Sequence, residues 1–142
     1  MLVADVGNTS TTIGLLRGGK VIRRGRVPTH GSTLNDIRDA MAEVSKGAAL
    51  RGAALSSVVD NRSRAFQTML KEVSGRPVCT VKHTLELGVR VTYPHPETIG
   101  PDRLANASAA VEIFRPPIVV ADFGTALTFD VITRDEGYAG GI

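Results

Sequence analysis

The first part of the chain alternates between short apolar stretches and groups of turn residues. Residues 1–6 and 10–17 are rich in apolar side chains, and Gly7-Asn8-Thr9 between them is typical of a tight turn. Gly18-Gly19 forms a second turn that leads into residues 20–27. The pattern therefore predicts a three-stranded antiparallel meander.

Three later stretches carry apolar residues at helical spacing. Thr33, with Asp36 three residues further on, predicts a capped helix start. The inward stripe of this helix is expected to be Leu34, Ile37, Met41 and Val44. A second helix is expected at about 62–73, ended by Gly75, and a third at about 102–114. The expected inward residues of the third helix are Leu104, Ala107, Val111 and Phe114.

The remaining apolar segments indicate strands. Residues 52–59 form a continuous run of small and apolar residues, which is typical of a buried strand with a parallel neighbour. Shorter strands are expected at 78–81 and 89–92, followed by a Pro-rich loop at 93–101. Together with the helices, these strands predict a layered α/β fold.

Beyond Pro116-Pro117 the opening pattern begins again. A strand is expected at 118–122, a turn at Gly124 and a second strand at 127–133. A further turn is expected near Glu136-Gly137. The chain is therefore expected to contain a second hairpin with a glycine in its turn, like the first one.

An offset of 117 residues aligns the two hairpins in sequence. Val3-Ala4-Asp5-x-Gly7 then falls on Val120-Ala121-Asp122-x-Gly124, and Thr11 falls on Thr128. Each copy is an apolar strand that ends in an Asp, followed by a Gly-containing turn. The repeat predicts a duplicated two-lobe architecture, with 1–115 as the first lobe and 116–142 as the start of the second.

Composition fits a globular chain with a mostly aliphatic core. The 142 residues are 42% hydrophobic and 22% charged, and there is no Trp. The lone cysteine, Cys79, cannot form an intrachain disulfide, which favours a reducing, cytoplasmic setting; we expect it to pack within a strand. No signal peptide precedes Asp5, and no apolar run approaches the roughly 20 residues of a membrane span, so a soluble intracellular protein is predicted.

The chain is basic, with a net charge of +3. Anionic partners are therefore favoured, although charge alone does not identify them. Five basic residues fall within ten positions: Arg17, Lys20, Arg23, Arg24 and Arg26. No aromatic residues are interleaved with them to stack on bases, so we expect a solvated hairpin face and no nucleic-acid partner.

The two hairpins have the composition of a phosphate site. A carboxylate at a strand end can hold the cation that bridges phosphate oxygens, usually Mg²⁺. The glycine and hydroxyl residues that follow allow main-chain amides to approach an anion closely. One Asp-x-Gly-Asn-Thr segment is also an ordinary turn, but two copies facing one cleft would favour binding of ATP phosphates.

Other common catalytic signatures are absent. The segment from Gly14 to Lys20 imitates a P-loop, but Val21 replaces the required Ser or Thr, and the segment joins two strands. The three histidines lack metal-ligand spacing: His30, His83 and His95. There is also no Gly-x-Ser-x-Gly elbow of a serine hydrolase.

A third group of candidate residues begins at Tyr93 and ends in Gly100-Pro101-Asp102-Arg103. Pro101 suits the first turn of a helix, and Asp102 lies where the helix dipole favours a negative charge. Asp102 therefore has a structural interpretation as a stabiliser of the helix start. The same Asp-Arg pair also suits a general base and a charge clamp beside a phosphate cleft.

The order of these segments resembles the type III pantothenate kinases, members of the actin/hexokinase/Hsp70-like superfamily. The segments are Asp5-Val-Gly-Asn-Thr9, Gly100-Pro-Asp-Arg103, Asp122-Phe-Gly-Thr-Ala-Leu-Thr-Phe-Asp130 and Gly140-Gly141-Ile142. The resemblance implies an α/β, duplicated actin-like (ribonuclease H-like) two-lobe fold. It also implies phosphorylation of pantothenate by ATP with Mg²⁺, activation by potassium or ammonium, and a cytoplasmic homodimer.

The resemblance assigns a role to each matching residue. The implied ATP-binding residues are Asp5, Val6, Gly7, Asn8, Thr9, Ser10, Thr11, Thr12 and Thr125. Asp102 would be the proton acceptor, and Asp122 would bind the monovalent cation, with Asp5 also near Mg²⁺ through the phosphates. The implied pantothenate-binding residues are Tyr93, Gly100, Pro101, Asp102 and Arg103. Pro101 departs from the family pattern, which commonly has a small residue such as Ala there.

The resemblance leaves two alternatives open. The family has a non-catalytic branch that acts as a transcription accessory factor, and the basic hairpin is the feature that points to it. Another sugar or acetate kinase of the superfamily is the second alternative. Because family members are longer, residues 1–142 are expected to cover the first lobe and the opening hairpins of the second, and to transfer phosphate poorly alone.

Overall fold

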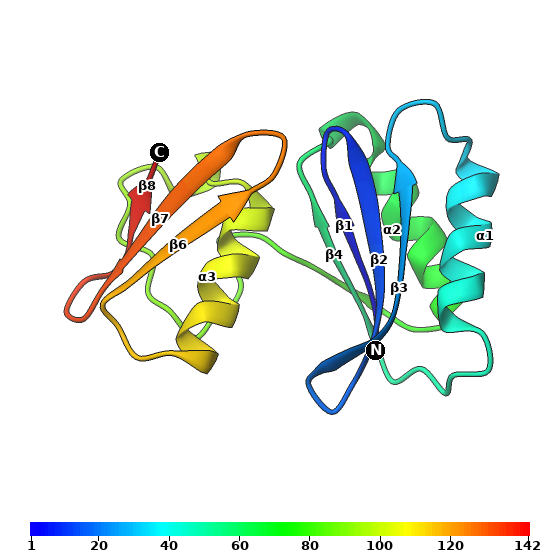
Figure 1. The fold of residues 1–142 in the computed structure, drawn as a ribbon, viewed down its shortest axis with the longest axis horizontal. Coiled ribbons are helices and arrows are strands. Elements are labelled where there is room, and N and C mark those ends of the chain that lie inside the picture. Colours follow the sequence, from blue (N-terminus) through cyan, green and yellow to red (C-terminus); the bar gives the residue numbers. More distant parts are fainter. The chain divides into compact units, whose positions relative to one another are not determined.

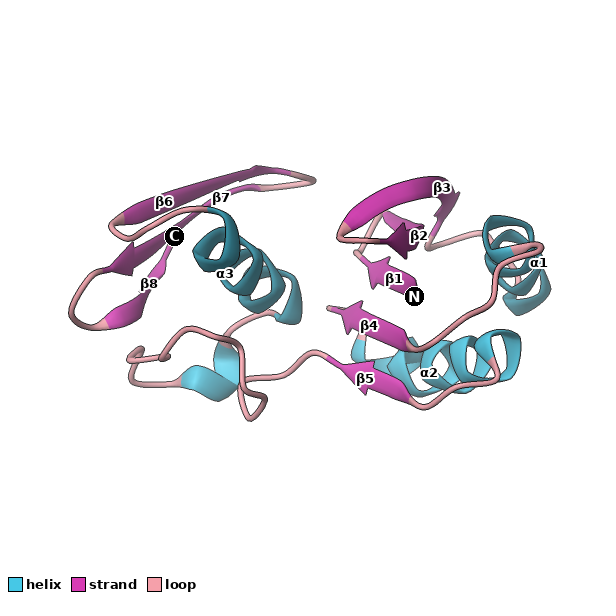
Figure 2. Ribbon diagram, turned by 90° about the horizontal axis from the view of Figure 1, so that it is seen from below, coloured by secondary structure: helices cyan, strands magenta, loops and turns pink.

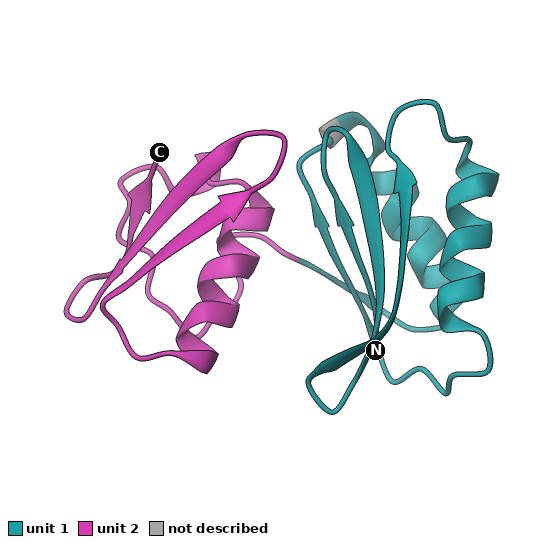
Figure 3. Ribbon diagram, in the orientation of Figure 1, with its two compact units in different colours: residues 1–80 teal, residues 81–142 magenta. Residues whose placement is uncertain are grey.

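The structure is a computed structural model, and it describes residues 1–142 apart from Asp60. It consists of two compact units, Met1–Thr80 and Val81–Ile142, shown in different colours in Figure 3. Each unit has its own sheet and its own group of buried residues. The units are therefore described separately (Figure 1).

The first unit is built on a five-stranded mixed sheet with the strand order β3-β2-β1-β4-β5. The strands are β1 (Leu2–Val6), β2 (Ser10–Arg17), β3 (Lys20–Pro28), β4 (Ala53–Ser57) and β5 (Val78–Thr80). The first three pair antiparallel, which confirms the predicted meander. β1 also pairs parallel with β4, and β4 with β5, as the apolar run at 52–59 predicted.

Two helices, α1 (Leu34–Ser45) and α2 (Asp60–Ser74), cover one face of this sheet (Figure 2). The core between sheet and helices is aliphatic except for Phe66. It includes Leu2, Val6, Ile13, Leu55, Ile37, Met41 and Leu70. The prediction for Leu34 was wrong: it is 45% exposed, because the first helical residue lies beyond the edge of the core.

The start of α1 and the end of α2 follow the sequence signals. Thr33 and Asp36 form a complete capping box, in which the Thr33 hydroxyl accepts from the Asp36 N–H at 3.1 Å and the Asp36 carboxylate accepts from the Thr33 N–H at 2.7 Å. The Thr33 hydroxyl also donates to this carboxylate at 2.7 Å, and this hydrogen bond, together with the one from the Thr33 N–H, lowers the pKa of Asp36. At the end of α2, Gly75 has φ 62°, the left-handed conformation that glycine adopts without strain.

The basic residues of the β2–β3 hairpin lie on the surface of this unit. The five basic residues of the β2–β3 hairpin are exposed, as expected for a solvated face. Arg26 Nε donates to Ser10 Oγ at 2.9 Å, and Arg23 donates to the Lys46 carbonyl at 2.8 Å.

Cys79 lies in β5 but is exposed, so the expectation that it packs within the strand layer was wrong. Its side chain lies on the sheet face opposite the helices, since its neighbours Val78 and Thr80 are more buried.

The second unit contains a three-stranded antiparallel sheet, β6-β7-β8, and one long helix. Its elements are η1 (Pro96–Thr98), α3 (Pro101–Ile113), β6 (Ile118–Phe123), β7 (Leu127–Thr133) and β8 (Gly137–Gly141). Leu104 and Ala107 of α3 are buried as predicted, but Phe114 is 62% exposed because the helix ends before it. The expected strand at 89–92 reduces to one isolated bridge between Val91 and Tyr138.

The strand registers reproduce the repeat and correct one detail of it. Asp5 pairs with Thr12 in the first unit, and Asp122 pairs with Thr128 in the second. Thr128 therefore corresponds to Thr12, and the predicted match to Thr11 was wrong. The reason is that the second turn is one residue shorter: Val6 pairs with Thr11, whereas Phe123 pairs with Leu127.

The corresponding faces of the two hairpins differ in burial. In the first unit, the face that carries Leu2, Val6 and Ile13 is buried under α1 and α2. Its counterpart in the second unit is apolar and exposed over Val119, Phe123, Leu127, Phe129 and Val131. Within the described residues, α3 packs on the other face of β6 and β7, the face of Asp122 and Asp130.

The predicted lobe boundary at 115/116 stays a prediction. The compact units of this structure divide after Thr80, because α3 packs against β6 and β7. Among the helices that the structure describes, none has both the length and the apolar character needed to cross a bilayer.

Candidate functional site

The turn between β1 and β2 holds the first predicted phosphate segment. Asp5 is exposed, while Val6 after it is fully buried, so the strand's alternation turns the carboxylate away from the helices. The Gly7 N–H donates to the Ser10 carbonyl at 3.1 Å and closes the turn. A Cβ at Gly7 would lie 3.2 Å from that same oxygen, which explains the glycine. Asn8 and Thr9 at the tip are exposed.

The hydroxyl residues of this segment divide into two groups. Thr11 is fully buried, and its Oγ1 lies 3.0 Å from the Thr29 hydroxyl, so its side chain belongs to the core. Ser10 and Thr12 are half-buried, and the Ser10 hydroxyl accepts from Arg26. If Val6 and Thr11 contact a nucleotide, the contact can come only from their main chain. The candidate phosphate-facing groups are therefore Asp5, Thr12 and the amides of the turn.

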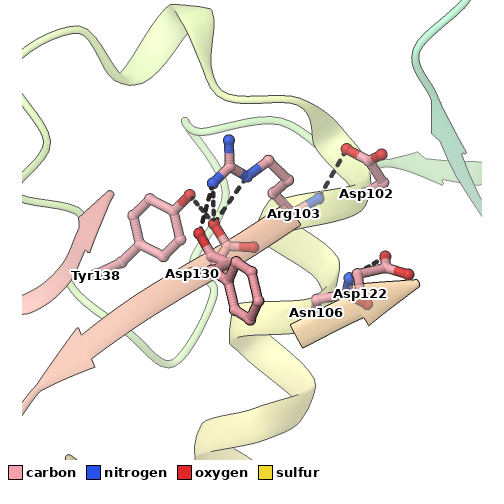
Figure 4. A network of polar contacts seen from close by, with 7 residues as sticks. Asp102, Arg103, Asn106, Asp122, Asp130 and Tyr138 are labelled. Carbon is pink, nitrogen blue, oxygen red and sulfur yellow. Dashed lines mark hydrogen bonds and ion pairs between the residues drawn. The ribbon is translucent and has the colours of Figure 1, made fainter. Parts of the chain in front are cut away.

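The equivalent turn of the second unit follows β6. Asp122 is half-buried, and its Oδ2 accepts from the Asn106 amide of α3 at 2.9 Å (Figure 4). The Gly124 N–H donates to the Ala126 carbonyl at 3.1 Å, and Thr125 is exposed at the tip. Asn106 was not predicted from the sequence. It fixes one oxygen of Asp122 and so orients the other.

No group of three or more His, Cys, Asp or Glu side chains is placed to hold a metal ion among the residues that the structure describes. Residues 123–128, which follow Asp122 around the turn, carry no charged side chain, so a cation there would meet the Asp122 carboxylate and uncharged oxygens. That donor set suits a weakly held hard cation better than a zinc ion, which needs several nitrogen or sulfur ligands. The residues at this turn thus fit the predicted kind of cation.

The start of α3 presents Asp102 and Arg103 side by side. Gly100 is the N-cap residue and Pro101 occupies the first turn, as the sequence indicated. Asp102 Oδ1 accepts the main-chain N–H of Arg103 at 2.8 Å. This contact supports the structural interpretation of Asp102 as a stabiliser of the helix start. It occupies only one of the two carboxylate oxygens, so it does not exclude a role as a base.

Arg103 reaches from α3 to β7, where it meets a buried carboxylate (Figure 4). Its Nε donates to Asp130 Oδ1 at 2.8 Å, and its Nη2 lies 2.7 Å from the same oxygen. Nη2 also donates to the Phe129 carbonyl at 3.0 Å. Tyr138 of β8 donates its hydroxyl to Asp130 Oδ1 at 2.6 Å. One oxygen of Asp130 therefore ties together α3, β7 and β8.

The ionisation of these groups follows from their burial and contacts. Burial lowers the pKa of Arg103, but the hydrogen bond and charge of Asp130 outweigh it, and the net direction is upward. Burial raises the pKa of Tyr138, and so do the hydrogen bond to Asp130 and its charge. Arg103 thus stays charged and Tyr138 stays a hydroxyl donor throughout the physiological pH range.

A small cavity of about 60 Å³ lies beside Arg103, lined also by Tyr93, Thr98, Tyr138, Gly140 and Gly141. A Cβ at Gly141 would overlap the Phe129 carbonyl and crowd Arg103 Nη2, and one at Gly140 would lie 2.7 Å from the Tyr93 ring. Gly140 also has φ 110°. The glycine pair is therefore required where β8 passes against Tyr93 and Arg103.

The structure places the predicted pantothenate-binding residues in one unit, whereas the predicted ATP-binding residues are divided between the two units. Tyr93 and Arg103 line the cavity, and Gly100, Pro101 and Asp102 lie in the same unit. The segment from Asp5 to Thr12 belongs to the first unit and Thr125 to the second, so their joint contact with ATP stays a prediction. Asp130 and Tyr138 were missed as site residues, although Asp130 ends a quoted segment. A charged residue in the middle of an apolar strand was the available signal.

The sequence of the chain matches the model of the type III pantothenate kinase family over residues 1–142. A type III pantothenate kinase of Thermomicrobium roseum is 35% identical over 148 aligned positions, which cover 99% of this chain and 57% of that protein. The chain thus spans less than three fifths of the length of the curated relatives it matches.

Solved structures agree on the fold. A candidate Baf-family transcriptional activator from Campylobacter jejuni superposes with a TM-score of 0.56 at 16% identity, over 100% of this chain and 53% of that one. A candidate 2-dehydro-3-deoxygalactonokinase from Sinorhizobium meliloti gives a TM-score of 0.56 at 13% identity, over 99% and 52%. The fold is thus the duplicated α/β fold that the repeat predicted, and it agrees with the actin-like fold that the family resemblance implied. The match over all of residues 1–142 and the order of the three Asp-containing segments place this chain in the type III pantothenate kinase family.

Proposed function

We propose that the protein transfers the terminal phosphate of ATP to the hydroxyl of pantothenate, giving 4′-phosphopantothenate in the first step of coenzyme A synthesis. The observation that carries this proposal is the family match over the whole chain. The adjacent Asp102 and Arg103, with Arg103 lining a cavity, supply groups suited to the chemistry. A carboxylate can accept the hydroxyl proton, and a guanidinium can bind the carboxylate end of the acceptor.

Asp102 is the proposed proton acceptor. Its Oδ1 accepts the Arg103 N–H, which fixes the carboxylate at the helix start and leaves Oδ2 to orient the acceptor hydroxyl. Phosphoryl transfer passes through a loose transition state, so the base mainly orients the nucleophile and takes the proton late. The position at the first turn of α3 also places the carboxylate in the favourable field of the helix dipole.

The two Gly-containing turns are the proposed nucleotide and cation sites. Asp5, Thr12 and the amides between Gly7 and Ser10 would bind ATP phosphates with Mg²⁺, and Thr125 would contact ATP from the second unit. Asp122, oriented by Asn106, would hold potassium or ammonium. The monovalent cation would supply positive charge near the phosphates.

A homodimer in the cytoplasm completes the proposal. The lone Cys79 supports a reducing compartment, and the family resemblance supports the dimer. Both are tested by size measurement and fractionation of the protein as its natural gene encodes it. A monomer by sedimentation, or recovery outside the cytoplasmic fraction, would contradict these two points without affecting the proposed reaction.

A transcription-accessory role is the second candidate, favoured by the exposed basic hairpin from Arg17 to Arg26. It predicts salt-dependent DNA binding that weakens when Arg23 and Arg24 are replaced by Gln. The kinase proposal predicts that this double variant keeps its rate of phosphate transfer, since neither residue belongs to the proposed site.

The test of the proposed function is acceptor-dependent ADP release by the protein as its natural gene encodes it. ATP, Mg²⁺ and potassium are supplied, with pantothenate, a panel of sugars or acetate as the acceptor. The proposal predicts ADP release with pantothenate and little with the others. Faster release with a sugar or acetate would assign the chain to another small-molecule kinase of the superfamily.

A further inference from the structure

Asp130 is the most constrained polar residue of the second unit. Its side chain is 0% exposed, although a buried carboxylate is costly unless it is paired. Three donor atoms converge on its Oδ1: Arg103 Nε, Arg103 Nη2 and the Tyr138 hydroxyl. Its other oxygen, Oδ2, is buried and has no hydrogen-bond partner among the described residues. A carboxylate kept purely for stability would be expected to have both oxygens satisfied.

The contacts of Asp130 leave one guanidinium nitrogen available. Nε and Nη2 of Arg103 are engaged by Asp130 and the Phe129 carbonyl. Nη1 makes no hydrogen bond within the described part of the chain, and in Figure 4 it points away from Asp130. The guanidinium is planar, so fixing two of its nitrogens also fixes the direction of the third.

The cavity beside Arg103 has the size of one small polar group. Its volume of about 60 Å³ corresponds to roughly two water molecules at about 30 Å³ each. The close passage of Gly140 and Gly141 limits its extent. A carboxylate that entered it would meet the guanidinium of Arg103, a cation that the hydrogen bond and charge of Asp130 favour in its charged form.

We propose that Asp130 and Tyr138 are positioning residues that orient the Arg103 guanidinium toward the carboxylate of the phosphate acceptor. This arrangement makes the site selective for acceptors that carry a carboxylate as well as a hydroxyl. The inference rests on the proposed function. It assigns substrate discrimination to two residues that act through Arg103, of which Tyr138 also lines the cavity, and it leaves the proton transfer to Asp102.

The Tyr138 hydroxyl strengthens this arrangement. It donates to the same Asp130 oxygen that accepts from Arg103, and so holds that oxygen in place for the guanidinium. Its raised pKa keeps it a donor at all working pH values. Tyr138→Phe removes this one hydrogen bond and leaves the ring in the core, so folding is expected to persist.

The test compares Tyr138→Phe, Asp130→Asn and the control Asp135→Asn, all in the protein as its natural gene encodes it. Asp135 lies in the β7–β8 turn, and its carbonyl, not its carboxylate, accepts from Arg90 at 2.7 Å. The control thus removes a nearby negative charge without touching Arg103. The acceptors are pantothenate and its neutral analogue with an alcohol in place of the carboxylate. KM for each acceptor, KM for ATP, kcat and the melting temperature are measured.

We expect Tyr138→Phe to raise KM for pantothenate about 3- to 10-fold, the range for one lost hydrogen bond. Asp130→Asn should raise it about 10- to 100-fold, because a charged partner is lost. KM for ATP should stay unchanged, and kcat/KM for the neutral analogue should fall much less than for pantothenate. Asp135→Asn should behave as the parent.

An equal loss of kcat/KM for both acceptors, or a lowered melting temperature with unchanged KM values, would overturn the inference and leave Asp130 as a core ion pair. If Asp130→Asn does not fold, Tyr138→Phe decides alone. A parent protein that phosphorylates neither acceptor contradicts the proposed function itself. If the parent phosphorylates pantothenate but the variants lower kcat/KM equally for both acceptors, only the inference is contradicted.

Discussion

At the scale of single residues, Asp102 carries two roles that the structure allows together. Its Oδ1 accepts the Arg103 N–H in the first turn of α3, which is a structural contact. The proposed catalytic role uses the other oxygen. A substitution that keeps the shape and the capping capacity but removes the charge separates the two, because Asn also accepts such hydrogen bonds.

Asp102→Asn is expected to lower kcat by about 10² to 10⁴, the usual contribution of general acid–base catalysis. The melting temperature should barely change, since no core packing is altered. Glu112→Gln, which removes a charge from the exposed side of the same helix, is the control and should leave kcat unchanged. If Asp102→Asn keeps kcat within a few-fold of the parent, Asp102 is only a stabiliser of the helix start.

Asp122→Asn tests the cation assignment. The substitution keeps an oxygen that can accept from Asn106 but removes the charge that a cation would meet. The concentration of potassium that gives half-maximal activity should rise roughly tenfold. This change corresponds to only a small part of the Coulomb energy of a close ion pair, because the site is half exposed and water screens the charges. KM for pantothenate should change little. An unaltered response to potassium or ammonium would show that the cation lies elsewhere.

Sequence reasoning found the residues that stand at strand and helix ends and missed those inside the sheet. Asp5, Asp102 and Asp122 were predicted because carboxylates at such ends are accessible, and the structure places each of them at such an end. Asp130 and Tyr138 lie within β7 and β8 and act through Arg103. The charge of Asp130 within an apolar strand was a local signal that Asp130 is special. Its partnership with Arg103 and Tyr138 joins three elements, so no local pattern could have indicated that partnership.

At the scale of elements, α1 offers a direct test of the capping signal. Thr33 and Asp36 satisfy each other's main-chain N–H groups. Thr33→Ala should lower the free energy of unfolding of the first unit by about 1 kcal/mol, measured by urea denaturation. Ser32→Ala is the control, because within the described residues the hydrogen bond of Ser32 is made by its main-chain carbonyl, which accepts from Arg62 at 3.4 Å. Equal effects of the two substitutions would contradict the capping role.

The capping box also predicts a pH dependence. The Thr33 hydrogen bonds lower the pKa of Asp36 below its ordinary value of 3.8 in the folded state. A lowered folded pKa means that the stabilisation is complete above the unfolded pKa and is lost as the pH falls through the folded one. Asp36→Asn should therefore destabilise the first unit at pH 7, and the difference from the parent should shrink below about pH 3.8. A difference that grows on acidification would contradict this.

The elements were predictable where the apolar pattern was long and bounded by turn residues. The meander, β4 and β7 match their predicted segments closely. The strand expected at 89–92 was wrong, because only Val91 finds a partner there, and that partner is Tyr138 of the distant β8. Phe114 was expected to face inward, but α3 ends at Ile113 before the Pro116-Pro117 segment. A tertiary contact decided the first outcome, and the position of the helix end decided the second.

At the scale of the whole molecule, the two units repeat one hairpin design in different surroundings. Asp5 opposite Thr12 and Asp122 opposite Thr128 occupy the same positions in their sheets. The repeat was visible in the sequence because a carboxylate and a glycine recur after similar apolar strands. The proposed joint contact of the two turns with one nucleotide was not predictable from composition or spacing, since it depends on the arrangement of the units.

The most direct test of the account is identification of the product formed from ATP and pantothenate by the protein as its natural gene encodes it. Mass spectrometry measures whether the acceptor gains one phosphate, and phosphorus NMR locates it. The proposed function predicts a single new species, phosphorylated at the 4′ hydroxyl, that Asp135→Asn forms at the parental rate and Asp102→Asn forms about 10² to 10⁴ times more slowly. Absence of this species, or its undiminished formation by Asp102→Asn, would contradict it.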